Sequence, residues 1–409
     1  MCATLPTATR SGKCESLITL NLDELHEIMN VVQMFVDERC IFRTQFERFL
    51  KKVVRTRDIL PPYLFIPGVQ KIGTNAVGGG GFADVWRGEL EGKPVALKVL
   101  RIFGPQTECA KIFKEFSKEA MIWRQFDHPN ILPFHGCCRD LFTPLYAFIS
   151  PWMENGDMVS FLKQNPNADR LAMVRGVASG LCYLHNLRPQ VIHGDLRGVS
   201  SKTTQLHFAY YIRKSNVLID ENKLPRIADF GLATVADTQA ISLATVSYNG
   251  KGSLRWQAPE LLSFSKEATE SVKTTDGSDV YAFACLCLEV FTDRPPFSGL
   301  SDGTVIAALL IHDERPARPL APAAERGLDD EMWDLMQNCW ATRRSERPRM
   351  KAVYERIRPY TPSEDRRDDR EPFTSQATSD RRRVFDLPEE CFKPEIQRYR
   401  LGVKPSDLS

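Results

Sequence analysis

The sequence predicts an α+β fold in which a strand-rich segment precedes a helical one. Residues 71–150 contain short β-branched, alternating runs, of which residues 93–101 (KPVALKVLR) are the clearest. Residues 111–126 have helical spacing instead. Residues 157–187 and 280–292 are apolar enough for buried helices. At 409 residues, one large domain or two ordinary ones fit.

Composition and charge exclude several classes of protein. The 409 residues are 43% hydrophobic and 26% charged, which is typical of a globular protein. A formal net charge of +2 predicts no general affinity for nucleic acid or acidic membranes. The 11 cysteines show no zinc-ligand spacing, so free thiols in a reducing compartment are expected. No membrane-spanning run or secretory signal is visible, and a cytoplasmic or nuclear location follows by default.

The segments outside this domain have different patterns. Residues 1–70 are expected to be an extension whose stretch 21–56 has helical periodicity, capped by Asn21 or Asp23. Residues 358–409 are rich in charges, prolines and serines, which predicts a disordered tail.

Two motifs in the strand-rich part suit phosphate binding. Residues 77–85 (VGGGGFADV) contain four glycines, which let a backbone fold closely over a phosphate. Residues 95–98 (VALK) follow, and Lys98 can hold phosphates as a point charge. Taken singly, a flexible turn and a solvated strand lysine are plainer interpretations.

Further motifs follow in a fixed order. They are HGDLRG at 193–198, DFG at 229–231 and GSLRWQAPE at 252–260. Together with the glycine and lysine motifs, they resemble a eukaryotic protein kinase over residues 71–357. The resemblance implies a bilobal kinase fold, with a β-rich N-lobe (71–152) and a mainly helical C-lobe (153–357). It also implies ATP and Mg²⁺ in the cleft between the lobes.

The resemblance assigns roles to individual residues. It implies that Lys98 pairs with Glu119, although Glu115 one turn earlier competes for that role. Asp195 is the implied catalytic base, and Arg197 the residue that steadies the transferred phosphoryl group. The implied metal ligands are Asn216 and Asp229. Other implied nucleotide contacts are Gly78, Gly79, Gly80, Gly81, Phe82, Ala83, Val85, Ala96, Ser150 (the gatekeeper), Pro151, Met153 and Leu218. Proline at 151 is compatible, because this position needs only a carbonyl group.

The sequence departs from the kinase pattern at two positions. Ala83 replaces the last glycine of the loop, and Gly194 replaces an arginine that contacts phosphorylated activation segments. Control by activation-loop phosphorylation is therefore not expected. Ser253 and Trp256 together point to the tyrosine-kinase-like serine/threonine group.

Two structural pairs are also implied. Arg347 is expected to pair with Glu260, and Asp279 to brace the catalytic loop from below. A plainer role for Asp279, as a helix N-cap, is compatible with the same residue.

Residues 199–214 interrupt the catalytic motif. The kinase pattern needs an asparagine soon after Asp195, but Asn216 arrives late, and removing 199–214 restores the spacing. One interpretation is a surface loop, whose closure costs roughly 2–3 kcal/mol. The other is an unspliced intron, since Val199-Ser200 and Lys214 can be encoded as splice-site sequences. We favour the intron, and sequencing the transcript tests it.

Two functions follow as hypotheses. The leading one is a protein kinase, and the alternative is a catalytically impaired pseudokinase that acts as a scaffold. The interruption, Ala83 and Gly194 motivate the alternative. The sequence indicates neither the protein substrate nor the oligomeric state.

Overall fold

The computed structural model describes most of the chain as two compact units. One unit comprises Met1–Pro61 with Thr361–Ser409, and the other comprises Pro62–Tyr360. The described residues are 17–37, 43–57, 59–79, 83–101, 109–143, 145–198, 215–230, 234–235, 254–262 and 274–358. The predicted tail lies outside them except for residue 358, as does the interruption at 199–214.

Two separate helices of the first unit lie within residues 21–57, where the sequence showed one helical stretch. These helices are α3 (Leu22–Asp37) and α4 (Arg43–Arg57). Asn21 caps α3, because its Oδ1 accepts a hydrogen bond from the Glu24 backbone N–H over 2.9 Å. Of the two predicted caps, Asn21 is therefore the one used.

Helices α3 and α4 pack against each other. The rings of Phe35 and Phe46 lie 5.8 Å apart, and Arg57 donates to the Leu20 carbonyl over 3.1 Å. The fully or almost fully buried apolar positions of the two helices are Leu25, Met29, Val32, Val36, Phe46, Phe49, Leu50 and Val53. Apolar spacing runs through both helices, which is why periodicity alone did not separate them.

The second unit begins with an antiparallel sheet. Its strand order is β1-β3-β4-β6-β5, and β2 pairs with β3. The strands are β1 (Gln70–Ile72), β2 (Gly78–Gly79), β3 (Ala83–Leu90), β4 (Lys93–Leu100), β5 (Gly136–Cys138) and β6 (Ala147–Pro151). A short helix, η1 (Pro62–Leu64), precedes them.

Side-chain alternation along β4 gives the sheet two different faces. Val95, Leu97 and Val99 are buried in one apolar cluster with Ile149 of β6. Lys98 therefore belongs to the opposite face, where its cross-strand partner is Phe148.

Helix α5 (Cys109–Trp123) packs on the Phe148 side of the sheet. The ring of Phe116 stacks on Phe148 with centroids 4.1 Å apart. Glu119 lies three residues later, nearly one helical turn, and so on the same side of the helix. This contact brings Glu119 toward Lys98.

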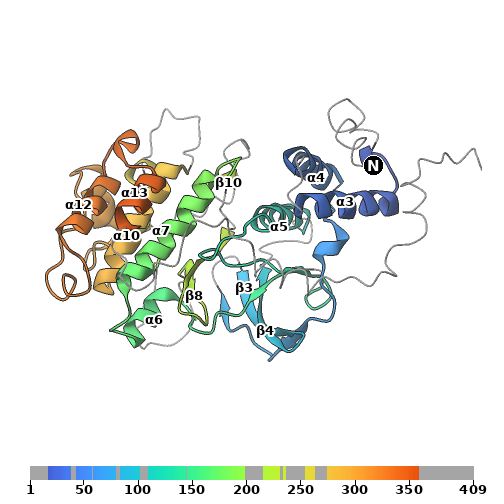
Figure 1. The fold of residues 1–409 in the computed structure, drawn as a ribbon, viewed down its shortest axis with the longest axis horizontal. Helices are drawn as coiled ribbons and strands as arrows, with labels where there is room; N and C mark the ends of the chain where they lie inside the picture. The colour runs from blue at the N-terminus through green and yellow to red at the C-terminus, as the bar shows by residue number, and fades with distance from the viewer. Residues whose placement is uncertain are drawn as a thin grey trace, which may run out of the picture. The chain divides into compact units, whose positions relative to one another are not determined.

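The rest of the unit is mainly helical, which confirms the predicted α+β class. Helices α7, α10, α12 and α13 are grouped together, apart from β3 and β4 (Figure 1). The helices are α6 (Met158–Gln164), α7 (Arg170–Asn186), α9 (Pro259–Leu262), α10 (Asp276–Thr292), α11 (Asp302–Leu310), α12 (Asp330–Cys339) and α13 (Met350–Ile357). The shorter elements are β7 (Val191–Ile192), β8 (Val217–Ile219), β9 (Pro225–Ile227), β10 (Thr234–Val235), η4 (Leu254–Trp256) and η5 (Arg344–Glu346).

Helix α10 is the core of this helical part. Its residues from Gly277 to Phe291 are all buried, as expected for a helix that is apolar on every side. Thr275 caps it in a capping box with Ser278. Asp279 is therefore not the N-cap, and its carboxylate is left for other contacts. Among the described residues, no helix is both long and apolar enough to cross a membrane.

Candidate active site

Asp195 and Asn216 meet although residues 199–214 separate them in the chain. Asn216 Nδ2 donates to Asp195 Oδ2 over 2.9 Å, and both residues are buried. Arg197 Nη2 lies 3.2 Å from the same Asp195 oxygen. The interruption therefore does not keep Asn216 away from the catalytic loop.

Asp279 holds the start of this loop from below. Its Oδ2 accepts from the His193 backbone N–H and its Oδ1 from that of Gly194, both over 2.8 Å. His185 Nε2 lies 2.9 Å from Asp279 Oδ2. Gly194 has a φ of 80°, which glycine adopts without the strain that a Cβ would add. The predicted brace is present, and glycine suits the bend it requires.

Lys98 lies between two carboxylates. Its Nζ is 2.6 Å from Glu119 Oε1 and 2.6 Å from Asp229 Oδ1. Glu119 therefore pairs with the lysine, as the resemblance implied. Asp229 has a φ of 67°, a left-handed conformation that is uncommon outside glycine and recurs at functional sites.

The surroundings shift the pKa of two of these groups. Burial raises the pKa of Asp195, and the nearby Arg197 guanidinium partly opposes that rise. Burial alone lowers the pKa of Lys98, but the carboxylates of Asp229 and Glu119 outweigh it and raise the pKa above its usual value. Lys98 is thus a fixed positive charge, whereas Asp195 is a stronger base than a solvated aspartate.

The described part of the glycine motif lies on β2 and β3. Gly79 pairs with Asp84, and a side chain at Gly79 would come within 2.9 Å of Asp84 Oδ1. Asp84 itself is held by Arg101, whose Nε donates to Oδ2 over 2.9 Å. Sequence reasoning missed this ion pair. The register of the β3–β4 hairpin would have indicated the pair, because it places Asp84 opposite Val99, two residues before Arg101.

Comparison with known proteins identifies the family. The model for protein tyrosine and serine/threonine kinases matches residues 72–357. The chain belongs to the protein kinase family. This kinase is 27% identical over 289 residues to the serine/threonine-protein kinase CTR1 of Arabidopsis thaliana, a match that covers 69% of this chain and 31% of CTR1.

Other relatives match the same part of this kinase. It is 32% identical over 289 residues to ephrin type-B receptor 4b of Danio rerio, covering 68% of this chain and 26% of the receptor. It is 28% identical over 328 residues to the probable serine/threonine-protein kinase pats1 of Dictyostelium discoideum, covering 74% of this chain and 9% of that protein. The chain thus spans less than a third of the length of each of these relatives.

The backbone groups at the end of β6, where the chain passes from the sheet to the helical lobe, point toward two different edges of the strand. Trp152 N–H donates to Pro94 of β4 over 3.2 Å, whereas the Ile149 carbonyl accepts from His135 on the other edge of β6. Because backbone groups alternate between edges, the Pro151 carbonyl lies on the same edge as that of Ile149. Strand β5 pairs with β6 only as far as Ile149, so this pairing does not include the Pro151 carbonyl.

The donor set of the kinase fits a magnesium ion. Asn216 Oδ1 is buried, and no described residue donates a hydrogen bond to it. The Asp229 carboxylate completes a pair of oxygen donors, the ligand type that Mg²⁺ prefers. An uncompensated buried oxygen is costly, and a bound cation would compensate it.

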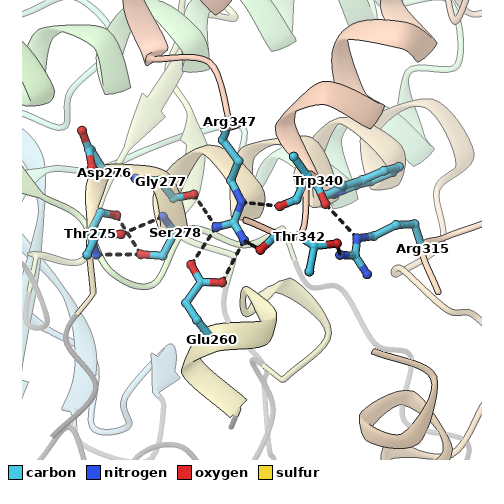
Figure 2. A network of polar contacts seen from close by, with 10 residues as sticks. Glu260, Thr275, Asp276, Gly277, Ser278, Arg315, Trp340, Thr342 and Arg347 are labelled. Atoms are coloured by element: carbon cyan, nitrogen blue, oxygen red, sulfur yellow. Dashed lines mark hydrogen bonds and ion pairs between the residues drawn. The ribbon is translucent and has the colours of Figure 1, made fainter. Parts of the chain in front are cut away.

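The predicted pair of Arg347 and Glu260 is present in the helical lobe. Arg347 Nη1 and Nη2 lie 2.7 and 2.8 Å from the two Glu260 oxygens, and Nη1 also donates to the Gly277 carbonyl (Figure 2). Arg315 extends this network by donating to the Trp340 carbonyl over 2.7 Å. These contacts tie the residues after the activation segment to the start of α10.

Some predicted site residues lie outside the described residues. They are Gly80, Gly81 and Phe82 of the glycine motif, with Gly231 and Ser253 of the activation segment. The remaining predicted nucleotide contacts fall into two groups. Those on the sheet and the segment between the lobes are Gly78, Gly79, Ala83, Val85, Ala96, Ser150, Pro151 and Met153. Leu218 lies on β8.

Proposed function

We propose that this kinase domain transfers the γ-phosphoryl group of ATP to a serine or threonine hydroxyl of a protein. One observation carries the proposal. Lys98 Nζ lies 2.6 Å from both Glu119 and Asp229, while Asn216 is hydrogen-bonded to Asp195. These groups come from distant parts of the chain, and phosphoryl transfer relies on such positioning.

The nucleotide is held by the sheet and by the segment between the lobes. Lys98, oriented by Glu119, pairs with the α- and β-phosphates as a point charge. Strand β2, which carries Gly78 and Gly79, covers the phosphates with backbone N–H groups. The Pro151 carbonyl accepts from the adenine amino group, and the Met153 N–H donates to the ring.

Asp195 receives the hydrogen bond of the substrate hydroxyl. Its raised pKa favours acceptance of that proton. Asn216 fixes the carboxylate through Nδ2, and Arg197 supplies positive charge 3.2 Å from Asp195 Oδ2, where it can steady the transferred group. Asn216 Oδ1 and Asp229 would hold Mg²⁺, which would neutralise charge on the phosphate oxygens.

Preference for serine and threonine rests on residues of this chain. The matching family model covers both kinase types. Ser253 occupies the position where serine/threonine kinases carry serine or threonine, and Trp256 is compatible with the tyrosine-kinase-like group. The names of CTR1 and pats1 agree with this preference.

A pseudokinase is the second candidate, because Ala83 and Gly194 depart from the family pattern. Incubation of the purified chain with radiolabelled ATP, Mg²⁺ and mixed peptides separates the two. We expect label on serine and threonine, which is absent in Asp195→Asn. Binding of ATP without transfer to any peptide would favour the pseudokinase, and label on tyrosine alone would contradict the specificity.

A further inference from the structure

Residues 62–66, which we call the strap, lie beside β5 before the first strand of the sheet begins. Phe65 forms a parallel β-bridge with Cys137, and the Ile66 N–H donates to the Cys137 carbonyl over 2.9 Å. Gly136 permits this approach, because a Cβ there would lie 2.6 Å from a carbonyl oxygen of the strap. The strap is therefore fixed to β5, although the proposed mechanism gives it no role.

Phe65 begins a series of aromatic contacts that reaches helix α5. Its ring lies 5.7 Å from that of Tyr146, the residue directly before β6. The Tyr146 ring in turn lies 5.4 Å from the ring of Phe113 and 5.5 Å from that of Phe116, which are both on α5. Aromatic rings at these separations attract one another, so the position of α5 depends on those of Tyr146 and Phe65.

A second contact joins the strap to the end of α5. Arg124, the first residue after this helix, donates from Nε to the Tyr63 hydroxyl over 3.1 Å. Its guanidinium carbon also lies 5.7 Å from the centre of the Tyr63 ring. Trp123, one residue earlier, donates from its indole N–H to the Leu132 carbonyl over 2.7 Å. Successive helical residues point about 100° apart, so the end of α5 is held from two directions.

Helix α5 carries Glu119, whose contact with Lys98 depends on where the helix lies. Phe116 is three residues before Glu119, so the two side chains leave nearly the same side of the helix. Glu119 Oε1 is 2.6 Å from Lys98 Nζ. Movement of α5 away from the sheet would break this contact, because charge-assisted hydrogen bonds span only about 2.7–2.9 Å. The strap is therefore connected to the nucleotide site through α5.

We propose that Tyr63 and Phe65 are positioning residues, which hold α5 in the place where Glu119 meets Lys98. The inference deepens the proposed kinase function, on which it rests. Both residues act through α5 and not by contact with the nucleotide. The strap, which connects α4 to β1 in the chain, thus has a role besides that of a linker.

The test is a double-mutant cycle between Phe65 and Glu119 in the full chain. Phe65→Ala should lower kcat/KM for a peptide about tenfold, and Glu119→Gln at least about tenfold. Since Phe65 acts through Glu119, the double variant should be no slower than Glu119→Gln alone. Losses that multiply in the double variant would overturn the inference, as would unchanged kinetics in Phe65→Ala.

Phe142→Ala is the matched control for loss of an aromatic side chain. Phe142 packs on the face of the sheet opposite Lys98, where its ring lies 5.7 Å from that of Trp86. We expect Phe142→Ala to change kcat/KM less than about twofold. A loss equal to that of Phe65→Ala would show a general effect of packing and contradict the inference.

Tyr63→Phe is a milder variant that tests the second contact. It removes only the hydroxyl to which Arg124 donates, and the aromatic ring remains. We expect kcat/KM to fall about threefold in a folded protein, and the loss to disappear when Glu119→Gln is also present. A loss that persists beside Glu119→Gln would show that Tyr63 does not act through α5.

Amide hydrogen exchange measures the position of α5 without any phosphoryl transfer. Residues 109–123 should lose protection in Phe65→Ala but not in Phe142→Ala. Unchanged protection of α5 in a folded Phe65→Ala protein would overturn the inference. Absence of transfer in the unmodified chain would instead reject the proposed function, and the exchange of α5 would still decide whether the strap holds this helix.

Discussion

The backbone N–H of Asn216 donates a hydrogen bond to the Arg197 carbonyl over 2.9 Å, although residues 199–214 lie between the two segments. If those residues were absent, Gly198 would join Ser215 directly. The hydrogen bond would then run from the fourth residue of a turn to the first, as in a β-turn. Arg197 and Asn216, which flank the interruption, are therefore hydrogen-bonded as they would be in a loop without residues 199–214.

Deletion of residues 199–214 should therefore leave the active site intact. We expect the deletion variant to bind ATP at least as well as the full chain. Its free energy of unfolding should be higher by about 2 kcal/mol, because a long loop no longer has to be closed. Thermal and denaturant unfolding with and without Mg²⁺ and ATP would measure both.

A matched variant replaces residues 199–214 with a glycine-serine linker of equal length. It separates the effect of loop length from that of the loop sequence. An unfolded deletion variant, or one that no longer binds ATP, would show that the segment is part of the structure.

Substitution of Glu119 should impair transfer more than substitution of Glu115. Glu119→Gln removes one of the two charges that orient Lys98, so we expect kcat/KM to fall by at least tenfold. Glu115→Gln serves as the matched control one turn earlier. Lys98→Met should abolish transfer while the protein stays folded, as circular dichroism would show. Equal effects of the two glutamate substitutions would contradict the assignment.

The sequence predicted these contacts where motif spacing is fixed by the fold. Lys98 and Glu119 could be paired because one follows a glycine motif and the other occupies a set place on the next helix. The α+β fold is confirmed for the same reason. The brace at Asp279 was also predicted, although Thr275 is the cap of α10.

Other contacts depend on how elements pack, which a single sequence does not show. The division of residues 21–56 into two helices leaves no break in apolar periodicity. The hydrogen bond from the Trp256 indole N–H to Glu289 joins two segments that are 33 residues apart in the chain. The opposite charges of Asp84 and Arg101 do not indicate an ion pair until the register of the hairpin is known.

Gly194 should resist substitution because of its backbone conformation. Its φ of 80° costs a residue with a Cβ about 1–2 kcal/mol, so Gly194→Ala should lower the free energy of unfolding by that amount. Gly92, with a φ of 76° in the turn after β3, is the control. Both alanine variants should be destabilised, but only Gly194→Ala should lower kcat. A stable Gly194→Ala protein would show that the loop adopts another conformation.

His128 should make the domain less stable in acid. Burial, with the nearby Arg226 charge, lowers the pKa of His128 from 6.5 to about 4. The unfolded chain therefore binds a proton that the folded domain excludes between these values, and stability is lost as pH falls below 6.5. From pH 8 to pH 5 the loss is about 2 kcal/mol.

Denaturant unfolding of His128→Gln across this pH range checks the effect. The variant should lose less stability on acidification than the unmodified chain. His312→Gln, at an exposed histidine of the same domain, is the control. A pH dependence that is the same in all three proteins would rule out His128 as its source.

We propose that a single magnesium nucleotide binds between Lys98, Asp195, Asn216 and Asp229. The most direct measurement is an X-ray structure of the full chain with Mg²⁺ and a non-hydrolysable ATP analogue. We predict a metal ion bonded to Asn216 Oδ1 and the Asp229 carboxylate, with phosphates in contact with Lys98. A nucleotide bound elsewhere, or a metal ion that avoids both residues, would contradict the account.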